Sequence, residues 1–325
     1  MRVPKSPPDI SIVVANWNGE AFIRRCLETL KISADAAPHA CEIIVVDDAS
    51  EDKSPAIIQS EFPGARLLIN AKNLGFGRSC NRGAREAAGR ILILANNDLA
   101  VPREFVQEIA APFFADAEEP LFVVGAKTVE MEDSTKPNHL CMYPAWRRGA
   151  IGKEWCDPAE QQDFSYAQAG AAAYDREKFL SLGGFQEMFH PGYWEDYEIC
   201  WRAMRYGWRC LYEPRAVARH VGEGSIVRRY GLGRMERIRE RNRLFFVWMN
   251  LQDPLLWARH ILALPWIYGR DLFQGRGLRL FWGFLMALPR IPRIIGIRRK
   301  RRSLRFKTKN KDRQIFKKAQ QIHEQ

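Results

Sequence analysis

The sequence lacks the cysteine patterns that form disulfide scaffolds or zinc sites. Seven cysteines, an odd number, are scattered over the 325 residues, and no two of them form a Cys-x-x-Cys pair. This spacing argues against a disulfide scaffold and a zinc ribbon, and it suits a reducing compartment. The opening MRVPKSPPDI also lacks the apolar stretch of a secretory signal. We therefore expect a cytoplasmic protein.

Long apolar runs are missing as well. Beyond Arg241 the sequence is rich in Trp and Leu, but prolines, glycines and charges interrupt it, and the run from Leu280 to Pro289 covers only ten residues. A helix that spans a membrane needs about 20 apolar residues. We therefore expect no membrane-spanning helix in this chain.

Most of the chain lacks an excess of either charge. The net charge is +12, and residues 290–325 alone hold 14 Lys and Arg against two acidic residues, so the rest is neutral overall. Trp- and Leu-rich segments followed by a basic tail are typical of a region that lies on an anionic membrane. We expect residues 241–325 to form an amphipathic helical region with a polybasic tail, peripheral on the inner face of the cytoplasmic membrane.

Short apolar runs rich in β-branched residues alternate with helical patterns over the first 100 residues. The runs are ISIVVAN, CEIIVVDD, ARLLIN and RILILANND. This alternation predicts an α/β fold with a mostly parallel sheet flanked by helices. Further along, we expect strands at 121–129 and 208–214, a loop-rich stretch at 130–165 and a helix at 198–207.

Polar side chains follow three of the four strands. Asn16 and Asn18 follow the first, Asp47 and Asp48 the second, and residues 96–98 the fourth. Ligands bind such sheets at the carboxyl ends of the strands, where an Asp can accept hydrogen bonds from a ribose or a base. The last of these residues, an Asp, also offers the hard oxygen ligands that Mg²⁺ or Mn²⁺ prefers. The structural alternatives are helix caps and Asx-turns.

The stretch NLGFGRSCNRG at 73–83 raises a second functional class, an NAD(P)-dependent oxidoreductase. Its third glycine falls at Gly83, because Cys80 occupies the position that the dinucleotide fingerprint requires, and it follows the third strand rather than the first. Both departures argue against that class, although a glycine-rich turn at a helix N-terminus can still bind an anion. A third class is a polyanion-binding protein that holds nucleic acid with its tail. The neutral body argues against it, so we expect no nucleic acid partner.

The sequence GYWEDYEICW at 192–201 places carboxylates among aromatic side chains. Burial among aromatic rings raises the pKa of a carboxyl group, which suits a general base. Glu195 and Asp196 are the candidates, and the structural alternative for both is capping of the following helix. Glu198 lies four residues before Arg202, a spacing that predicts a surface ion pair on the helix.

Seven stretches then occur in order across residues 10–226: SIVVANWNG, EIIVVDDAS, NLGFGRSCNRGAREAAG, ILILANND, AGAAAYDREKFLSLGGFQEMF, WEDYEICWRAMRYGWRCLYEP and AVARHVGEGSI. Together they resemble family 2 glycosyltransferases of the GT-A fold, particularly the branch similar to rhamnosyl- and galactofuranosyltransferases. The resemblance covers about two-thirds of the chain. It implies a Rossmann-like catalytic domain over residues 1–240.

The resemblance implies a set of donor-binding residues at the strand ends and the glycine-rich turn: Asn16, Asn18, Asp47, Asp48, Asn73, Gly75, Asn96, Asn97 and Asp98. Asp98 would bind the Mg²⁺ or Mn²⁺ ion that carries the diphosphate of a UDP- or dTDP-sugar, and His220 would complete the metal site. Three positions depart from the family pattern, because Asn96 replaces an acid, Gln186 an Asp and Glu198 an Asp.

The resemblance also implies an acceptor side. Inverting sugar transfer needs a base that takes the proton of the attacking hydroxyl. Asp196 matches that base, Glu195 is its neighbour, and Tyr193, Trp194 and Gly170 would contact the acceptor. The reaction implied is transfer of rhamnose or another hexose to a glycan or polyprenyl-linked acceptor in cell-surface polysaccharide synthesis.

Overall fold

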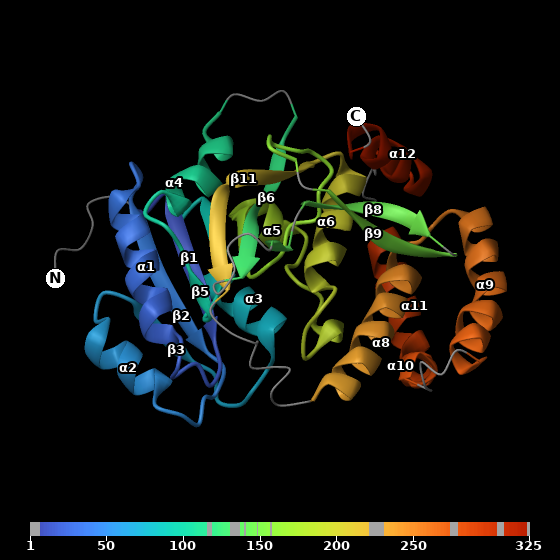
Figure 1. Cartoon of the computed structure of the whole chain (residues 1–325), viewed down its shortest axis with the longest axis horizontal. Helices are drawn as coiled ribbons and strands as arrows, with labels where there is room; N and C mark the ends of the chain where they lie inside the picture. Colours follow the sequence, from blue (N-terminus) through green and yellow to red (C-terminus); the bar gives the residue numbers. More distant parts are fainter. Residues whose placement is uncertain are drawn as a thin grey trace.

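The computed structural model describes residues 7–115, 119–130, 137–139, 141–147, 149–156, 158–220, 231–273, 279–303 and 309–323. Its centre is a nine-stranded sheet in the order β3-β2-β1-β4-β10-β6-β11-β5, with β7 paired to β6 (Figure 1). The strands of this sheet are β1 (Ile10–Asn16), β2 (Cys41–Asp47), β3 (Arg66–Ile69), β4 (Ile91–Asn96), β5 (Leu99–Ala100), β6 (Leu121–Glu130), β7 (Pro137–His139), β10 (Ala171–Asp175) and β11 (Arg209–His220).

The N-terminal half of the sheet is parallel, as the sequence predicted. β1 lies between β2 and β4 and runs parallel to both, and β3 continues the parallel set beside β2. β10 runs antiparallel between β4 and β6, and β11 lies parallel to β6. The register pairs Asn16 with Asp47 and Ala15 with Asn96, so the polar residues after these strands meet at one edge.

Helices cover both faces of the sheet, which explains why the central strands read as continuous apolar runs. Along β1, Val13 packs into the core on one face, while Ile12 and Val14 pack into the core on the other. The helices of this part of the chain are α1 (Ile23–Ala36), α2 (Ser54–Glu61), α3 (Phe76–Glu86), α4 (Phe105–Ala110), α5 (Arg176–Ser181) and α6 (Glu195–Tyr206).

The expectation of a loop-rich stretch at 130–165 was wrong. Besides β7, this stretch holds a two-stranded antiparallel hairpin of β8 (Cys141–Arg147) and β9 (Ala150–Cys156). Gly149 in its turn has φ 78°, a backbone conformation that glycine adopts without strain. A side chain at Gly149 would clash with Ala263 of the C-terminal region, so the turn of the hairpin packs directly against that region.

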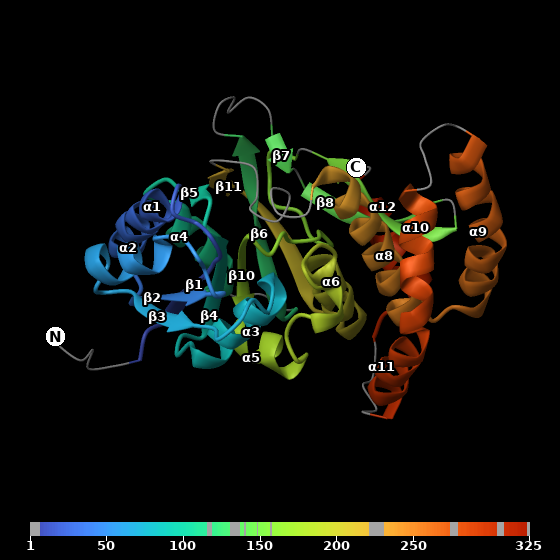
Figure 2. The ribbon, with the colours of Figure 1, turned by 90° about the horizontal axis from the view of Figure 1, so that it is seen from below.

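The C-terminal region is helical, as predicted. Its helices are α8 (Leu232–Asn250), α9 (Pro254–Phe273), α10 (Arg279–Ala287), the 3₁₀ turn η3 (Leu288–Arg290), α11 (Ile291–Ser303) and α12 (Asp312–His323). Figure 2 shows α9 at the opposite end of the molecule from the N-terminal strands. The expected boundary after residue 240 falls inside α8, whose Phe245 and Phe246 are buried in the same core as Val13. The division into two domains stays a prediction.

One apolar stretch is longer than the uninterrupted runs of the sequence indicated. Residues Leu280–Arg301 form 22 consecutive helical residues, because the helices continue through Pro289 and Pro292. In the described part of the chain this is the one helical stretch long and apolar enough to cross a membrane, judged by length and composition only. Only 17% of its apolar segment is buried inside the structure.

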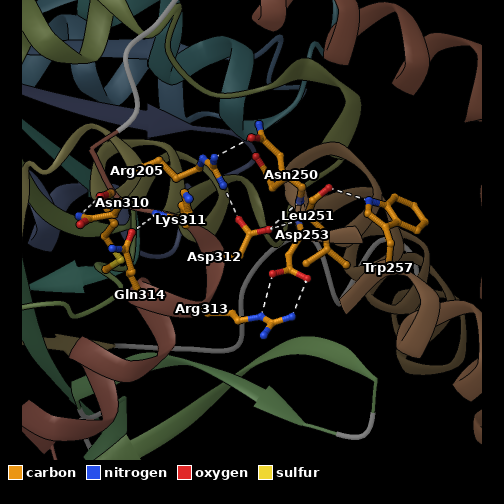
Figure 3. A network of polar contacts seen from close by, with 12 residues as sticks. Arg205, Asn250, Leu251, Asp253, Trp257, Asn310, Lys311, Asp312, Arg313 and Gln314 are labelled. Atoms are coloured by element: carbon orange, nitrogen blue, oxygen red, sulfur yellow. Dashed lines mark hydrogen bonds and ion pairs between the residues drawn. The ribbon is translucent and has the colours of Figure 1, made fainter. Parts of the chain in front are cut away.

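A buried carboxylate anchors the end of the chain to α6 and to the loop between α8 and α9 (Figure 3). Asp312, at the start of α12, accepts hydrogen bonds from the backbone N–H groups of Gln252 (2.6 Å) and Asp253 (2.8 Å). It also pairs with Arg205 near the C-terminus of α6. Arg313 pairs with Asp253 at 2.8 Å. Part of the predicted basic tail is therefore folded against α6.

Candidate active site

A single buried amide joins the carboxyl ends of three strands. Asn16 donates from Nδ2 to Asp47 Oδ2 (2.7 Å) and Ser54 Oγ (2.9 Å), and its Oδ1 accepts from Asn97 Nδ2 (2.8 Å). The side chain of Asn16 is fully buried. Gly19 lies so close that a Cβ there would clash with both amides. This network fixes the edge of the sheet at which ligands bind in parallel α/β folds.

Asp48 holds the glycine-rich turn before α3. Its carboxylate accepts from Asn70 Nδ2 (2.7 Å) and from the backbone N–H groups of Leu74 (2.8 Å) and Gly75 (2.7 Å). Gly75 has φ 88°, and a Cβ there would clash with the ring of His190. Glycine is therefore required at this position both by its backbone conformation and by the close approach of a side chain.

Asp47 organises the loop that follows β2. It accepts from Ser50 Oγ at 2.6 Å, and that hydroxyl accepts the backbone N–H of Asn18 at 2.9 Å. Asn18 is exposed and has φ 49°, and its Oδ1 accepts the backbone N–H of Glu51. Asn73 is half-buried beside the glycine-rich turn. The structure thus brings these donor-binding candidates to one edge, and their contacts with a nucleotide stay predictions.

Asp98 and His220 face each other beside this edge. β11 pairs with β5 so that His220 lies opposite Leu99, and His220 Nδ1 is 3.5 Å from Asp98 Oδ1. Asp98 is 5% exposed, and its Oδ1 is buried without a hydrogen-bond donor. Within the described residues no cluster of three metal-ligating side chains is present. The unsatisfied carboxylate oxygen of Asp98 and the imidazole of His220 could provide two ligands to a divalent cation.

The loop before α6 has a strained backbone that α8 holds in place. Tyr193 and Trp194 have φ values of 73° and 78°, in the left-handed region that non-glycine residues rarely adopt. Asn242 of α8 donates from Nδ2 to the carbonyl oxygens of Phe189 (2.9 Å), Gly192 (2.8 Å) and Tyr193 (3.0 Å). Such strain persists only where the surroundings over-determine the conformation, and it is typical of functional sites.

Glu195 occupies the first turn of α6 with an unsatisfied carboxyl group. Its side chain lies in the wall of a pocket between the start of α3, including Gly75 and Arg78, and the loop 186–192. Its Oε2 is buried and has no hydrogen-bond partner. Burial, together with the nearby charge of Asp196, raises the pKa of Glu195 to about 8. Glu195 is therefore protonated at neutral pH and able to donate a hydrogen bond.

Asp196 lies in a different environment. Burial raises its pKa, but the backbone N–H groups of Tyr197 and Ala169 and the ammonium of Lys153 oppose that rise by stabilising the carboxylate. The hydrogen bond from the Tyr197 N–H is 2.8 Å long. Sequence reasoning missed Lys153, which lies on β9 in the stretch expected to be loop. The spacing of two residues between Lys153 and Trp155 would have placed both side chains on one face of a strand.

Residues 169–170 connect the two groups of candidates. Gly170 accepts the backbone N–H of Asn96 at 2.9 Å, and a Cβ at Gly170 would clash with the Asn96 side chain. The backbone N–H of the preceding residue, Ala169, acts to lower the pKa of Asp196. The end of β4 and the first turn of α6 are thus joined through two consecutive residues.

The exposure predicted for Glu198 was wrong, although its pairing was confirmed. It forms the expected pair with Arg202 at 2.9 Å, but it is fully buried and also pairs with Arg301 of α11 at 2.7 Å. Burial acts to raise the pKa of Glu198, and the two guanidinium groups outweigh it and lower that pKa. The helical spacing gave the first partner, whereas the second arrives from a helix about a hundred residues away.

A family model now decides the class of protein. The model described as "Glycosyl transferase family 2" matches residues 11–183, which is more than half of the chain. The chain belongs to glycosyltransferase family 2. This membership argues against the oxidoreductase alternative.

The chain aligns with different shares of the length of its relatives. The chain is 29% identical over 231 residues to the succinoglycan biosynthesis protein ExoO of Rhizobium meliloti, covering 68% of this chain and 63% of that protein. It is 24% identical over 236 residues to the N-acetylglucosaminyl-diphospho-decaprenol L-rhamnosyltransferase of Mycobacterium tuberculosis, covering 65% and 75%. It spans 44% of the pre-mycofactocin glycosyltransferase of the same organism, at 23% identity over 226 residues and 67% of this chain.

Solved structures support the fold. Residues 1–349 of S. aureus TarS with UDP-GlcNAc match with a TM-score of 0.56 at 14% identity, covering 89% of this chain and 83% of that one. A mannosyltransferase from Pyrobaculum calidifontis with GDP-Man and Mn²⁺ matches with a TM-score of 0.52 at 16% identity, covering 93% and 81%. These likenesses confirm the predicted GT-A fold.

Proposed function

We propose that the protein is an inverting glycosyltransferase that moves rhamnose or another hexose from a UDP- or dTDP-sugar to a hydroxyl of a glycan or polyprenyl-linked acceptor. The observation that carries this proposal is the junction at Ala169 and Gly170, which joins the end of β4 to Asp196. A donor bound at the strand ends would thereby meet an acceptor bound at α6.

Asp196 is the base in this proposal. The acceptor hydroxyl passes its proton to Asp196 as its oxygen bonds to the anomeric carbon, while the bond to the nucleotide diphosphate breaks and that group leaves. Burial raises the pKa of Asp196, which suits a general base, while the N–H group of Tyr197, the charge of Lys153 and the N–H group of Ala169 stabilise its carboxylate form. Glu195, with its pKa raised to about 8, stays protonated and serves as a hydrogen-bond donor to substrate.

Asp98 and His220 would hold Mg²⁺ or Mn²⁺. The buried Oδ1 of Asp98, which lacks a donor, is the atom that such an ion would satisfy. The bound ion would neutralise the negative charge that develops on the departing diphosphate. The Pyrobaculum mannosyltransferase and a GalNAc-T7 structure were both solved with Mn²⁺.

The C-terminal region supports an acceptor at a membrane surface. Side chains of α9 and α10 are exposed although they are apolar, including Leu262 (78%), Trp266 (54%) and Trp282 (46%). Exposed apolar helices beside a basic segment favour an anionic membrane. The name of the mycobacterial rhamnosyltransferase describes a lipid-linked acceptor. We propose a cytoplasmic enzyme, peripheral on the inner membrane face, that acts in polysaccharide or cell-wall synthesis.

Turnover of nucleotide sugars tests the proposed activity. The purified full chain is incubated with Mn²⁺ or Mg²⁺ and a panel of UDP-, dTDP- and GDP-sugars, and the release of free nucleotide is followed by chromatography. We expect slow hydrolysis of a UDP- or dTDP-sugar that stops when the metal is chelated. Absence of binding and turnover for every sugar nucleotide would contradict the proposal.

Vesicle partition tests the proposed location. We expect the full chain to sediment with vesicles containing anionic lipid and to stay in solution with zwitterionic vesicles. Replacing exposed Leu262 and Trp266 by Ser should weaken sedimentation without unfolding the chain, because neither side chain is buried. If double-stranded DNA displaces the protein from anionic vesicles at physiological salt, the basic segment binds nucleic acid and the membrane assignment fails.

A further inference from the structure

Two cations flank a row of aromatic rings beside Asp196. The row consists of Tyr193, Trp194 and Tyr197, and the last two rings meet edge to face with centroids 5.3 Å apart. The guanidinium carbon of Arg239, on α8, lies 4.3 Å from the ring centroid of Tyr193. The ammonium of Lys153, on β9, lies 4.6 Å from the ring centroid of Tyr197. Both cations therefore belong to the surroundings of the first turn of α6.

Neither cation has a carboxylate partner within the described part of the chain, although nearby arginines do. Arg243, one turn along α8, pairs with Glu240 at 2.7 Å, and Arg301 pairs with Glu198. Lys153 instead donates to the hydroxyl of Tyr197 at 2.9 Å. Burial and the charge of Arg239 both act to lower the pKa of Lys153, and only the charge of Asp196 opposes them. Lys153 is partly buried, whereas Arg239 is exposed. A partly buried cation without an ion-pair partner is costly, and an anion bound at Lys153 would relieve that cost.

The position of Lys153 favours an anion that comes with the acceptor. The diphosphate of the donor has its own candidate site at Asp98 and His220, at the strand ends. Lys153 lies on the β8–β9 hairpin, whose turn docks onto α9 through a hydrogen bond of 2.6 Å between Gly149 O and His260 Nδ1. α9 also carries the exposed Leu262. The hairpin that carries Lys153 thus contacts both α6, through Tyr197, and α9, through His260.

We propose that Lys153 and Arg239 bind the phosphate groups of a lipid-linked acceptor, holding its sugar hydroxyl at Asp196. This inference rests on the proposed function and names the chemical class of its acceptor. Arg239 forms charge-assisted hydrogen bonds to phosphate oxygens while stacked on Tyr193, and Lys153 supplies a second positive charge at the other end of the aromatic row. No covalent step beyond sugar transfer is involved.

Binding of three probes, a lipid diphosphate, the uncharged lipid alcohol and inorganic pyrophosphate, tests the proposal. Geranylgeranyl diphosphate, geranylgeraniol and inorganic pyrophosphate are titrated into the full chain in neutral detergent by calorimetry. We expect Lys153→Met and Arg239→Met each to weaken geranylgeranyl diphosphate binding about tenfold, and Lys153→Arg to keep most of the affinity. Arg237→Met, an exposed cation on the same helix, is the matched control and should bind as the wild type does.

The probes separate the sources of the anion. Tighter binding of geranylgeranyl diphosphate than of pyrophosphate supports a lipid-linked ligand, whereas equal binding overturns the lipid part of the proposal. Equal affinity of all variants for geranylgeranyl diphosphate overturns the site. If Lys153→Met shifts only the pH profile of transfer, Lys153 is a positioning residue for Asp196 and the site is also overturned.

Nucleotide binding to the same samples distinguishes this inference from the proposed function. Weaker binding of UDP or dTDP in both variants, with unchanged binding of geranylgeranyl diphosphate, would assign the cations to the donor and overturn the inference. Failure of the wild type to bind any nucleotide would contradict the proposed function, while leaving a positive result with the diphosphate probe intact.

Discussion

The two sides of the candidate site satisfy their polar groups in opposite ways. On the donor side, Asn16, Asp47 and Asp48 are buried and hydrogen-bonded to neighbouring strands and loops. On the acceptor side, Glu195 has a buried oxygen without a partner, and Lys153 has no carboxylate partner in the described residues. The proposed donor side is built in advance by contacts within the chain. The proposed acceptor side has unsatisfied polar groups that a substrate could satisfy, at a cost in stability.

The largest effect on activity is expected at Asp98, the residue near the strand ends whose buried carboxylate oxygen has no hydrogen-bond partner. Asp98→Asn should slow metal-dependent transfer by about 10³-fold, because the leaving diphosphate loses its metal-held positive charge. Asp35→Asn, in an exposed pair with Lys31, is the matched control. Steady-state turnover with and without chelator measures both. Metal-stimulated turnover that survives in Asp98→Asn would contradict the assignment of Asp98 as ligand.

The next largest effect is a loss of stability on removal of Glu198, which connects α6 to α11. Glu198→Ala leaves Arg202 and Arg301 with no buried counter-charge, so the free energy of unfolding should fall by about 3–5 kcal/mol. Lys31→Ala removes one half of an exposed pair and should cost less than about 0.5 kcal/mol. Urea denaturation of both variants gives the comparison. Equal losses would show that α11 does not hold α6.

A smaller loss is expected from the network at the strand ends. Asn16→Ala removes its buried bonds to Asp47, Ser54 and Asn97, and the free energy of unfolding should fall by about 2–3 kcal/mol. Gln59→Ala on the exposed face of α2 should change it by less than about 0.5 kcal/mol. Affinity for the donor nucleotide should fall in Asn16→Ala alone. Unchanged stability and nucleotide affinity would argue against a prebuilt donor side.

The smallest effect is a gain of stability on the acceptor side. Burial raises the pKa of Glu195 from an ordinary 4.5 to about 8. Between these values the folded chain holds a proton that the unfolded chain has released, so the free energy of unfolding falls as pH rises. Glu195→Gln removes this loss and should be more stable than wild type at pH 8, with little difference at pH 4.5.

Urea denaturation of wild type and Glu195→Gln at the two pH values measures this gain. Parallel pH dependence of the two proteins would show that Glu195 is ionised in the folded chain. That result would remove Glu195 as a hydrogen-bond donor, while leaving the assignment of Asp196 as base unchanged.

Local patterns predicted the donor side better than the acceptor side. Apolar runs that end in Asn16, Asp47 and Asn96 suffice to place these residues at one edge, because parallel strands align their carboxyl ends. The aromatic surroundings of Asp196 indicated a raised pKa, and that direction is confirmed. Lys153 could not be found in the same way, because it reaches Asp196 from a hairpin whose position depends on contacts with α9.

Glu198 shows the same limit. Its spacing to Arg202 is a property of one helix and was readable, whereas its burial depends on α11 folding back over α6. The role of the basic segment was likewise misjudged in part, since Arg301 and Arg313 are used in ion pairs within the protein. Composition alone counts such charges as exposed.

The most direct test asks whether Asp196 acts as the base on an acceptor that attacks a donor bound at the strand ends. For the sugar nucleotide found by the hydrolysis panel, the transfer rate and the donor dissociation constant are measured in wild type and Asp196→Asn. We predict a rate lower by about 10³-fold with donor affinity unchanged within about twofold, because only proton removal from the acceptor is lost. Wild-type turnover in Asp196→Asn, or loss of donor binding along with activity, would contradict a base and a donor that meet in one site.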